Sequence, residues 1–229
     1  MVAVRGLAPS LHSHFGFETA ERRAGRYRSG YGWVPRRQSA RPAKRMINAL
    51  ETIPGVESVG LSNWMPLGVG ADDSHVFTDK TTDLRPGNAA ADVELFKVSP
   101  EYFRAAGTAL LVGRTFIWHD DKDAPRVAVI NQEFARKIFG SVTSAMGGYY
   151  KVPDGTRIQV VAIAEDGKYE SLTEDPQPAL FLPILQWPAS PTWLVVRSNR
   201  DPQQLGPAIK NTLRDLNARL PFSPLFWLD

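Results

Sequence analysis

Residues 98–116 read VSPEYFRAAGTALLVGRTF and predict a short helix that leads through a glycine into an apolar segment. The helix opens at residues 99–101, where a serine can cap it, a proline fits its first turn and a glutamate favours its positive end. Gly107 is expected to end the helix, because glycine readily adopts the left-handed conformation found there. Tyr102 and Phe103 can then anchor the helix onto a sheet.

Strands and helices alternate on both sides of this stretch. Apolar spacing along residues 205–216 is typical of a helix with one buried face, and turn formers at 81–87 and 153–155 indicate hairpin-like connections. Because the elements are interspersed in this way, the sequence predicts an α+β fold rather than a doubly wound parallel sheet. Helices are expected over 42–52, 132–139 and 201–216, and strands over 56–62, 76–79, 91–98, 126–131, 157–164, 179–182 and 193–197.

The chain has 229 residues, of which 43% are hydrophobic and 22% charged, so it can bury the core of one large or two small domains. It has no cysteine, which excludes a disulfide framework, a thiolate zinc site and a cysteine nucleophile. Its longest apolar runs, 109–112 and 179–185, are far shorter than the ~18 residues that a membrane helix needs. The first ten residues show no export signal.

Charge is distributed unevenly along the chain. Residues 1–45 hold ten Lys and Arg against two acids, whereas the rest holds 17 basic and 22 acidic residues. The sequence therefore predicts a basic, disordered arm over 1–41, followed by a mildly acidic body that ends in a short tail at 223–229. Such an arm could bind nucleic acid or an anionic lipid surface, or it could be a leader with no role in the fold.

No sequence motif indicates catalysis or nucleotide binding. The pair Gly167-Lys168 is followed by Tyr169 and lacks the upstream glycine of a phosphate-binding loop, and 68–70 (GVG) is interpreted as a turn. Neither a serine nucleophile elbow nor a zinc-protease helix motif occurs. We therefore expect a protein that is not an enzyme, with no catalytic and no cofactor-binding residues.

The histidines and acidic runs give no metal site either. His12 and His14 lack a third ligand nearby, and Ser74-His75 beside two aspartates makes no triad from adjacency alone. Residues 119–123 (HDDKD) carry carboxylates at alternate positions, as calcium ligands require, but the glycine and distant glutamate of a calcium loop are missing. A solvated turn is the favoured interpretation, and no metal or cofactor is expected.

Five segments in order resemble one known family. They are IPGVESVGLSNWMPLG (53–68), VSPEYFRAAGTALLVGRTF (98–116), APRVAVINQEFARKIFG (124–140), VVAIAEDGKYESLTEDPQPALFLPILQ (160–186) and WLVVRSNRDPQQLGPAIKNTLRDLNARLPF (193–222). Together they resemble the MacB-like periplasmic core domain of FtsX-like ABC transporter permeases, in particular the duplicated-permease subgroup. The resemblance covers about residues 42–222.

The resemblance implies a porter-like part built from both ends of the domain, at about 42–106 and 188–222, with an inserted mixed α/β part at about 107–187. It implies a periplasmic position outside the cell membrane. There the domain couples conformational change, powered by a separate ABC ATPase, to substrates or partners, among them a possible periplasmic protein. The family offers no catalytic residues to carry over. The region that the resemblance covers contains Arg114, Asp121, Asn131, Phe134 and Asp166. The aromatic residues Tyr102, Phe103, Phe134, Phe139 and Tyr169 are expected to pack.

The chain departs from the family at both ends. The basic arm stands where a transmembrane helix is expected, no permease helices follow and no duplication is visible, which suggests a fragment. Two other functions remain open: a soluble binding module whose arm engages nucleic acid or anionic lipid, and an unrecognised enzyme. The apolar stretch 220–228 could contact a membrane partner or pack against the body.

Overall fold

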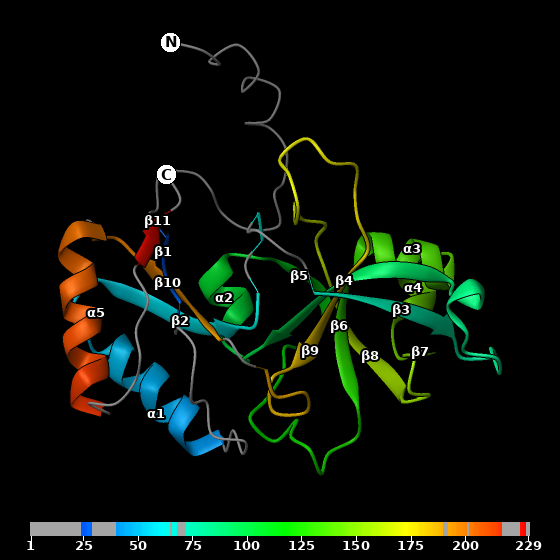
Figure 1. Cartoon of the computed structure of the whole chain (residues 1–229), viewed down its shortest axis with the longest axis horizontal. Coiled ribbons are helices and arrows are strands. Elements are labelled where there is room, and N and C mark those ends of the chain that lie inside the picture. The colour runs from blue at the N-terminus through cyan, green and yellow to red at the C-terminus, as the bar shows by residue number, and fades with distance from the viewer. Residues whose placement is uncertain are drawn as a thin grey trace.

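The computed structural model describes residues 24–28, 40–64, 66–67, 72–189, 192–200, 202–216 and 225–227. Its strands join into one extended sheet that carries two lobes (Figure 1). The strands are β1 (Ala24–Arg28), β2 (Val56–Ser62), β3 (Asp73–Thr78), β4 (Ala91–Val98), β5 (Leu110–Gly113), β6 (Val127–Asn131), β7 (Tyr149–Lys151), β8 (Arg157–Ala164), β9 (Ala179–Pro183), β10 (Trp193–Ser198) and β11 (Leu225–Trp227). The helices are α1 (Ala40–Glu51), α2 (Tyr102–Ala106), α3 (Gln132–Phe139), α4 (Val142–Ala145) and α5 (Pro202–Leu216).

The first lobe, which we call the terminal lobe, is built from both ends of the described chain. Its strands lie in the order β11-β1-β10-β2, each antiparallel to the next, and α1 and α5 pack side by side on the sheet (Figure 1). Apolar side chains spaced along the two helices meet those of β2 and β10 in a buried cluster. It contains Ile47, Leu50, Val59, Leu61, Leu194, Val196, Leu205, Ile209 and Leu213. The predicted apolar face of the last helix therefore lies in this cluster, and α5 contacts α1 and β1.

The second lobe is a closed barrel of six strands. Strand β4 pairs in parallel with β9, β9 pairs with β6, and β6 pairs in parallel with β8. From β8 the ring continues through β7 to β3 and back to β4 by antiparallel pairs. Helix α3 contacts β4, β6, β8 and β9, and α4 packs on α3. We call the barrel with these two helices the barrel lobe.

Side chains alternate between the inside and the outside of this barrel, as the two-residue period of a strand requires. In β9, Leu180 and Leu182 point into the interior cluster, whereas Ala179 and Phe181 join a second cluster outside. The outer cluster packs the barrel against α2 and the terminal lobe, and contains Phe96, Val98, Tyr102, Phe103, Phe116, Tyr169 and Val195. The aromatic side chains expected to pack are thus placed in or against hydrophobic clusters, with Phe134 and Phe139 in contact at the barrel end.

Local sequence signals account for where helices α2 and α3 begin and end, with one exception. Helix α3 is capped at its start by Asn131, whose side chain accepts a hydrogen bond from the Phe134 backbone, and at its end by Gly140 with φ 78°. Helix α2 ends at Gly107, also with φ 78°, as expected. The predicted cap at Ser99 is wrong: its hydroxyl oxygen accepts from the Leu61 backbone at 3.0 Å, so it ties the helix entry to β2 instead.

The interspersed α+β class is confirmed, but one part of the predicted organisation is not. Residues 1–41 were expected to be a disordered arm, whereas Ala24–Arg28 forms β1 between β10 and β11, and α1 already begins at Ala40. Backbone pairing needs no apolar pattern, so composition did not reveal this strand. The short elements β5, β7 and α4 were also not predicted. The residue boundaries of the two parts stay a prediction, and β3 and β4 pair mainly with barrel strands.

Candidate functional site

The polar residues of the family-like segments mainly hold the fold together. Asn131 is fully buried and accepts hydrogen bonds from the backbones of Phe134, at 3.0 Å, and Ala179, at 2.8 Å. Its side-chain amide donates to the carbonyl oxygen of Gln177 at 2.8 Å. One side chain therefore fixes the start of α3, the start of β9 and the loop before it.

Asp166 supports the same helix from the loop after β8. Its carboxylate accepts from the Glu133 backbone at 2.7 Å and from the Arg136 guanidinium at 2.5 Å. The first of these bonds satisfies a free N–H of the first helical turn, and the second raises the pKa of Arg136. Asp166 is thus a structural partner of α3.

Arg114 forms a two-point ion pair with Asp120, at 2.8 and 3.1 Å. Asp120 is only 6% exposed, and it also accepts from the Ile117 backbone at 2.9 Å. This pairing raises the pKa of Arg114 and closes the loop after β5. Asp121 accepts from the Asp123 backbone at 3.0 Å, so residues 119–123 form a turn, as favoured from the sequence.

No set of histidines and carboxylates that could hold a metal ion occurs in the part of the chain that the structure describes. The His75 Nδ1 atom is in hydrogen-bonding contact with the Asp92 carboxylate across β3 and β4. His12, His14 and the turn at 68–70 lie outside the described residues.

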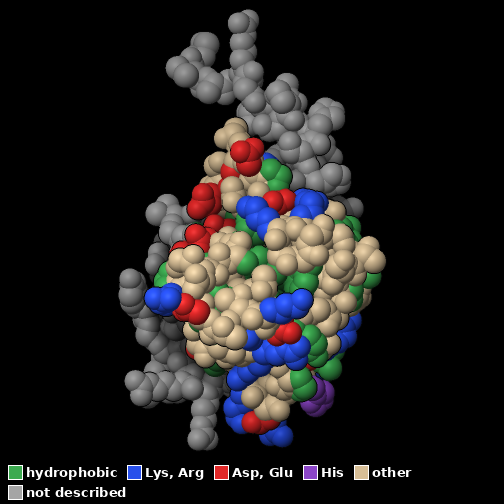
Figure 2. Space-filling view, turned by 90° about the vertical axis from the view of Figure 1, so that its right-hand side faces the viewer, with side chains coloured by type: hydrophobic (Ala, Val, Ile, Leu, Met, Phe, Trp, Pro, Cys, Tyr) green, Lys and Arg blue, Asp and Glu red, His purple; other side chains and the backbone are tan. Residues whose placement is uncertain are grey.

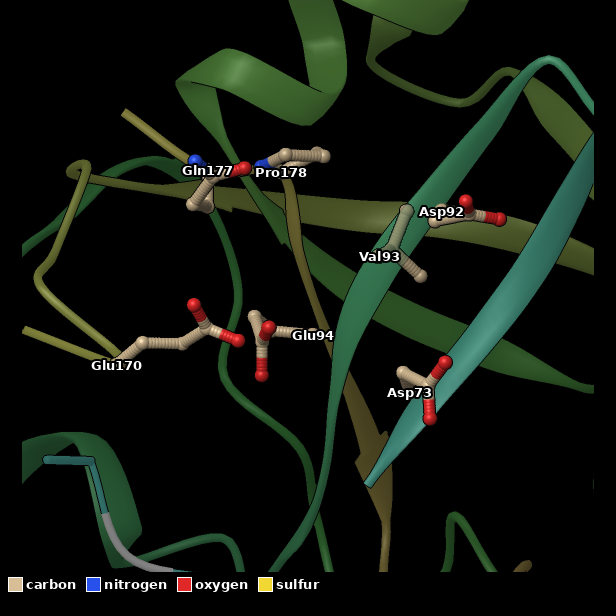
Figure 3. A pocket seen from close by; sticks show the side chains of 7 residues that line it. All are labelled: Asp73, Asp92, Val93, Glu94, Glu170, Gln177 and Pro178. Carbon is tan, nitrogen blue, oxygen red and sulfur yellow. The ribbon is translucent and has the colours of Figure 1, made fainter. Parts of the chain in front are cut away.

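An acidic cleft lies on the outer face of the barrel, with a volume of about 350 Å³ (Figure 3). Its lining comes from β3, from β4 and from the loop 165–178 that precedes β9. The register of the sheet sets Asp73 of β3 opposite Glu94 of β4. In Figure 3 the carboxylates of Glu94 and Glu170 point toward one another. The lining residues are Asp73, Asp92, Val93, Glu94, Glu170, Gln177 and Pro178.

Glu94 is the most perturbed carboxyl group of this cleft. Burial, followed by the negative charges of Glu170, Glu174 and Asp73, raises its pKa from 4.5 to about 7. Its Oε2 atom is buried and has no hydrogen-bond partner among the described residues. A proton on Glu94 would lower both the cost of burial and the repulsion, because a neutral carboxyl costs less to bury and does not repel the other acids. The cleft can therefore take up or release a proton near neutral pH.

The loop on the far side of the cleft is held in shape by Glu174. Its carboxylate accepts from the backbones of Tyr169, at 2.6 Å, and of Glu170 and Ser171, both at 2.7 Å. The Tyr169 ring is buried and lies 5.4 Å from the ring of Phe96 in β4, which anchors the loop to the barrel. Burial raises the pKa of the Tyr169 phenol far above its usual range.

Sequence reasoning missed this cleft. Residues 73, 94 and 170 are distant in sequence, and only the β3–β4 register and the fold of the loop bring them together. The one local signal is Glu94 itself, an acid on the same strand face as the buried Phe96 and Val98.

Comparison with models of protein families identifies the family of the chain. The model of the MacB-like periplasmic core domain matches residues 15–212. The chain belongs to this family. The match begins inside the predicted arm, in agreement with the pairing of β1 to β10. No curated protein matches the sequence significantly.

Solved structures of similar fold agree with the assignment to the MacB-like periplasmic core domain. The periplasmic region of MacB from Actinobacillus actinomycetemcomitans has a TM-score of 0.57 and 16% identity, over 95% of this chain and 93% of that one. The extracellular domain of the noncanonic ABC-type transporter YknZ from Gram-positive bacteria has a TM-score of 0.54 and 17% identity, over 89% and 100%. A domain of a putative permease from Porphyromonas gingivalis has a TM-score of 0.55 and 17% identity, over 93% and 92%.

These likenesses confirm the predicted fold class, an α+β MacB-like periplasmic core domain with a porter-like part. Among the helices that the structure describes, none is both long and apolar enough to cross a membrane.

Proposed function

We propose that this MacB-like domain acts without catalysis, as an extracytoplasmic part of an ABC-type permease that transmits movement between its two lobes. The observation that carries the proposal is the narrow pairing between the sheets of the two lobes, beside which the lobes are packed together by the outer apolar cluster. Strand β4 pairs with β9 over five register positions, but it meets β2 of the terminal lobe at one register pair only, Ser62 with Val98. A connection of this kind allows one lobe to tilt against the other without breaking either.

Hydrogen bonds and apolar packing accompany that pair. The backbones of Asn63 and Lys97 are hydrogen-bonded at 3.0 Å, and the Asn63 side chain accepts from the Lys97 N–H at 2.6 Å. Helix α2 adds packing, because it contacts β2 and β10 while its aromatic residues join the cluster on the barrel. Movement of the terminal lobe would therefore reach the barrel through β4 and α2.

The proposed partners follow from family membership. They are the transmembrane helices of a permease, a separate ABC ATPase that powers the movement, and a protein partner on the outer side. No nucleic acid or small-molecule cofactor enters this function. We also retain the proposal that the chain is a fragment of a longer permease system.

The mobility of the connection can be tested with two spin labels. Because the chain has no cysteine, Asn48→Cys with Thr143→Cys would carry labels on α1 and α4, one in each lobe. Asn48→Cys with Asn211→Cys places both labels in the terminal lobe and serves as the matched control. We expect a broad distance distribution between the lobes and a narrow one within the terminal lobe. Equally narrow distributions would show a rigid molecule and overturn the proposal.

The partners can be tested in the native host with a tagged chain. Cross-linking and isolation of membranes should recover a permease and an ABC ATPase with the tagged chain. Recovery of the chain from the soluble fraction, with neither protein attached, would contradict the proposed assembly.

The alternative, a nucleic-acid or lipid-binding module, rests on the ten basic residues within 1–45. The body offers less support. The barrel end shows Lys and Arg side chains with acids among them (Figure 2). Arg157 of β8 is paired with Asp79 at 2.6 Å. Titration of labelled DNA and anionic vesicles across a salt series distinguishes the functions. Arm-dependent binding that persists near roughly 0.15 M salt would favour the alternative.

A further inference from the structure

The acidic cleft has the composition of a proton-sensitive contact. Its two walls carry charges of the same sign, with Glu94 on β4 and Glu170 on the loop 165–178. Glu174 of the same loop does not line the cleft, but its negative charge also acts on Glu94. The loop is long and has no regular secondary structure. It lies on β4 through the Phe96 and Tyr169 rings and through the Glu94 backbone N–H, which donates to the Pro178 carbonyl at 2.9 Å. Repulsion between the walls therefore acts directly against the closed position.

No neighbouring cation neutralises Glu94 among the described residues. Lys97 of the same strand is engaged with Asp72 at 3.0 Å, and the Lys168 ammonium donates to the Glu174 carbonyl. Strand β9 contributes no titratable side chain to the contact. Strand β3 carries Asp73 and His75, and His75 pairs with Asp92 of β4. Helix α3 carries Glu133, Arg136 and Lys137, and its Arg136 pairs with both Glu133 and Asp166.

We propose that Glu94 and the loop 165–178 form a proton-controlled latch, in which the loop is closed on β4 while Glu94 holds a proton and loosens when that proton is lost. Loss of the proton sets a buried carboxylate, with one unpartnered oxygen, against three further acids. The cost of burying the charge and the repulsion from the three acids both favour separation of the walls and entry of water. The latch requires only the fold of this chain, so its failure would leave the proposed coupling function untouched.

The direction of the pH response follows from the Glu94 pKa of about 7 in the closed state. In the open state the carboxyl is hydrated and its pKa falls toward 4.5, so opening releases a proton. Raising the pH through about 7 therefore favours the open loop. A difference of one pKa unit between the states changes the closed-to-open ratio by up to about tenfold.

Hydrogen exchange of the full chain tests the latch. We expect the protection factors of the Tyr169, Glu170 and Ser171 amides, corrected for the intrinsic exchange rate, to fall about tenfold between about pH 6 and about pH 8. Glu94→Gln keeps the shape of the side chain without its charge, and should hold the loop closed at both pH values. Asp175→Asn removes an exposed carboxylate of the same loop that does not line the cleft, and should retain the wild-type response.

Two results would overturn the latch. The first is equal protection at both pH values in the wild type, and the second is a Glu94→Gln chain that responds to pH like the wild type. An NMR titration of the Glu94 carboxyl carbon provides an independent readout, since an inflection near 4.5 instead of about 7 would remove the physical basis of the latch.

Discussion

The backbone of Gly60 in β2 lies so close to the start of α2 that a Cβ at position 60 would stand 2.6 Å from the Cα of Tyr102. Helix α2 therefore sits on the sheet with its backbone almost touching β2, and this closeness depends on the missing side chain.

Replacing that hydrogen with a methyl group should push α2 off the sheet. We expect Gly60→Ala to lower the free energy of unfolding by about 1–3 kcal/mol, measured by urea denaturation. Gly87→Ala is the matched control, because no atom lies within 4 Å of a Cβ there, and its effect should stay within about 0.5 kcal/mol. Equal effects of the two substitutions would contradict close packing at Gly60.

Asn131 should be costly to remove, because its side chain satisfies three buried backbone groups. We expect Asn131→Ala to reduce stability by roughly 2–4 kcal/mol, since two N–H groups and a carbonyl lose their partner. Asn88 is exposed and its side chain donates to the Asp83 carbonyl at 3.2 Å, also at an exposed site, so Asn88→Ala should be nearly neutral. A small effect at position 131 would mean that water replaces these bonds.

Much of what surrounds Asn131 could be predicted from local sequence. The run NQEFARKIFG contains a capping residue, an apolar helical pattern and a terminal glycine, so the bounds of α3 were predicted correctly. Strand β7 has three residues and is defined by its pairing with β3 and β8, which no local pattern encodes. Closure of the barrel and formation of the acidic cleft depend on the same distant pairings.

The ion pair of Arg114 with Asp120 should contribute more to stability than an ion pair on the surface. Arg114→Met leaves Asp120 buried without its two-point partner, and we expect a loss of roughly 1–3 kcal/mol in chemical denaturation. Lys122→Met breaks a pair with Asp123 in which both side chains are exposed, so its effect should fall within about 0.5 kcal/mol. Similar losses from both variants would argue against a special role for the buried pair.

The free energy of unfolding of the whole chain should also depend on the ionisation of Glu94. Because its pKa is raised in the folded protein, its protonation contributes stability that is fully present below about pH 4.5 and is lost as the pH rises through about 7. Glu94→Gln should therefore have a higher thermal midpoint than the wild type at about pH 8 and a similar one at about pH 4. A midpoint difference that does not change with pH would contradict the raised pKa.

Truncation separates the leading residues from β1. Removing residues 1–23 keeps every described strand, so the thermal midpoint should change little. Removing residues 1–30 also deletes β1, which lies between β10 and β11, and should lower the midpoint by several degrees. An unchanged midpoint after the longer deletion would restore the prediction that the whole arm is dispensable.

The register of β2 with β10 has a mechanical consequence. Val56, at the start of β2, lies opposite Ser198, at the end of β10, and these residues connect closely to α1 and α5. A force that pulls α1 and α5 apart would load the ribbon at this one end, and its hydrogen bonds would break one after another, as in a zipper. The barrel lies off this load path and would keep its shape while the ribbon yields. We therefore expect the terminal lobe to yield before the barrel when α1 and α5 are pulled apart.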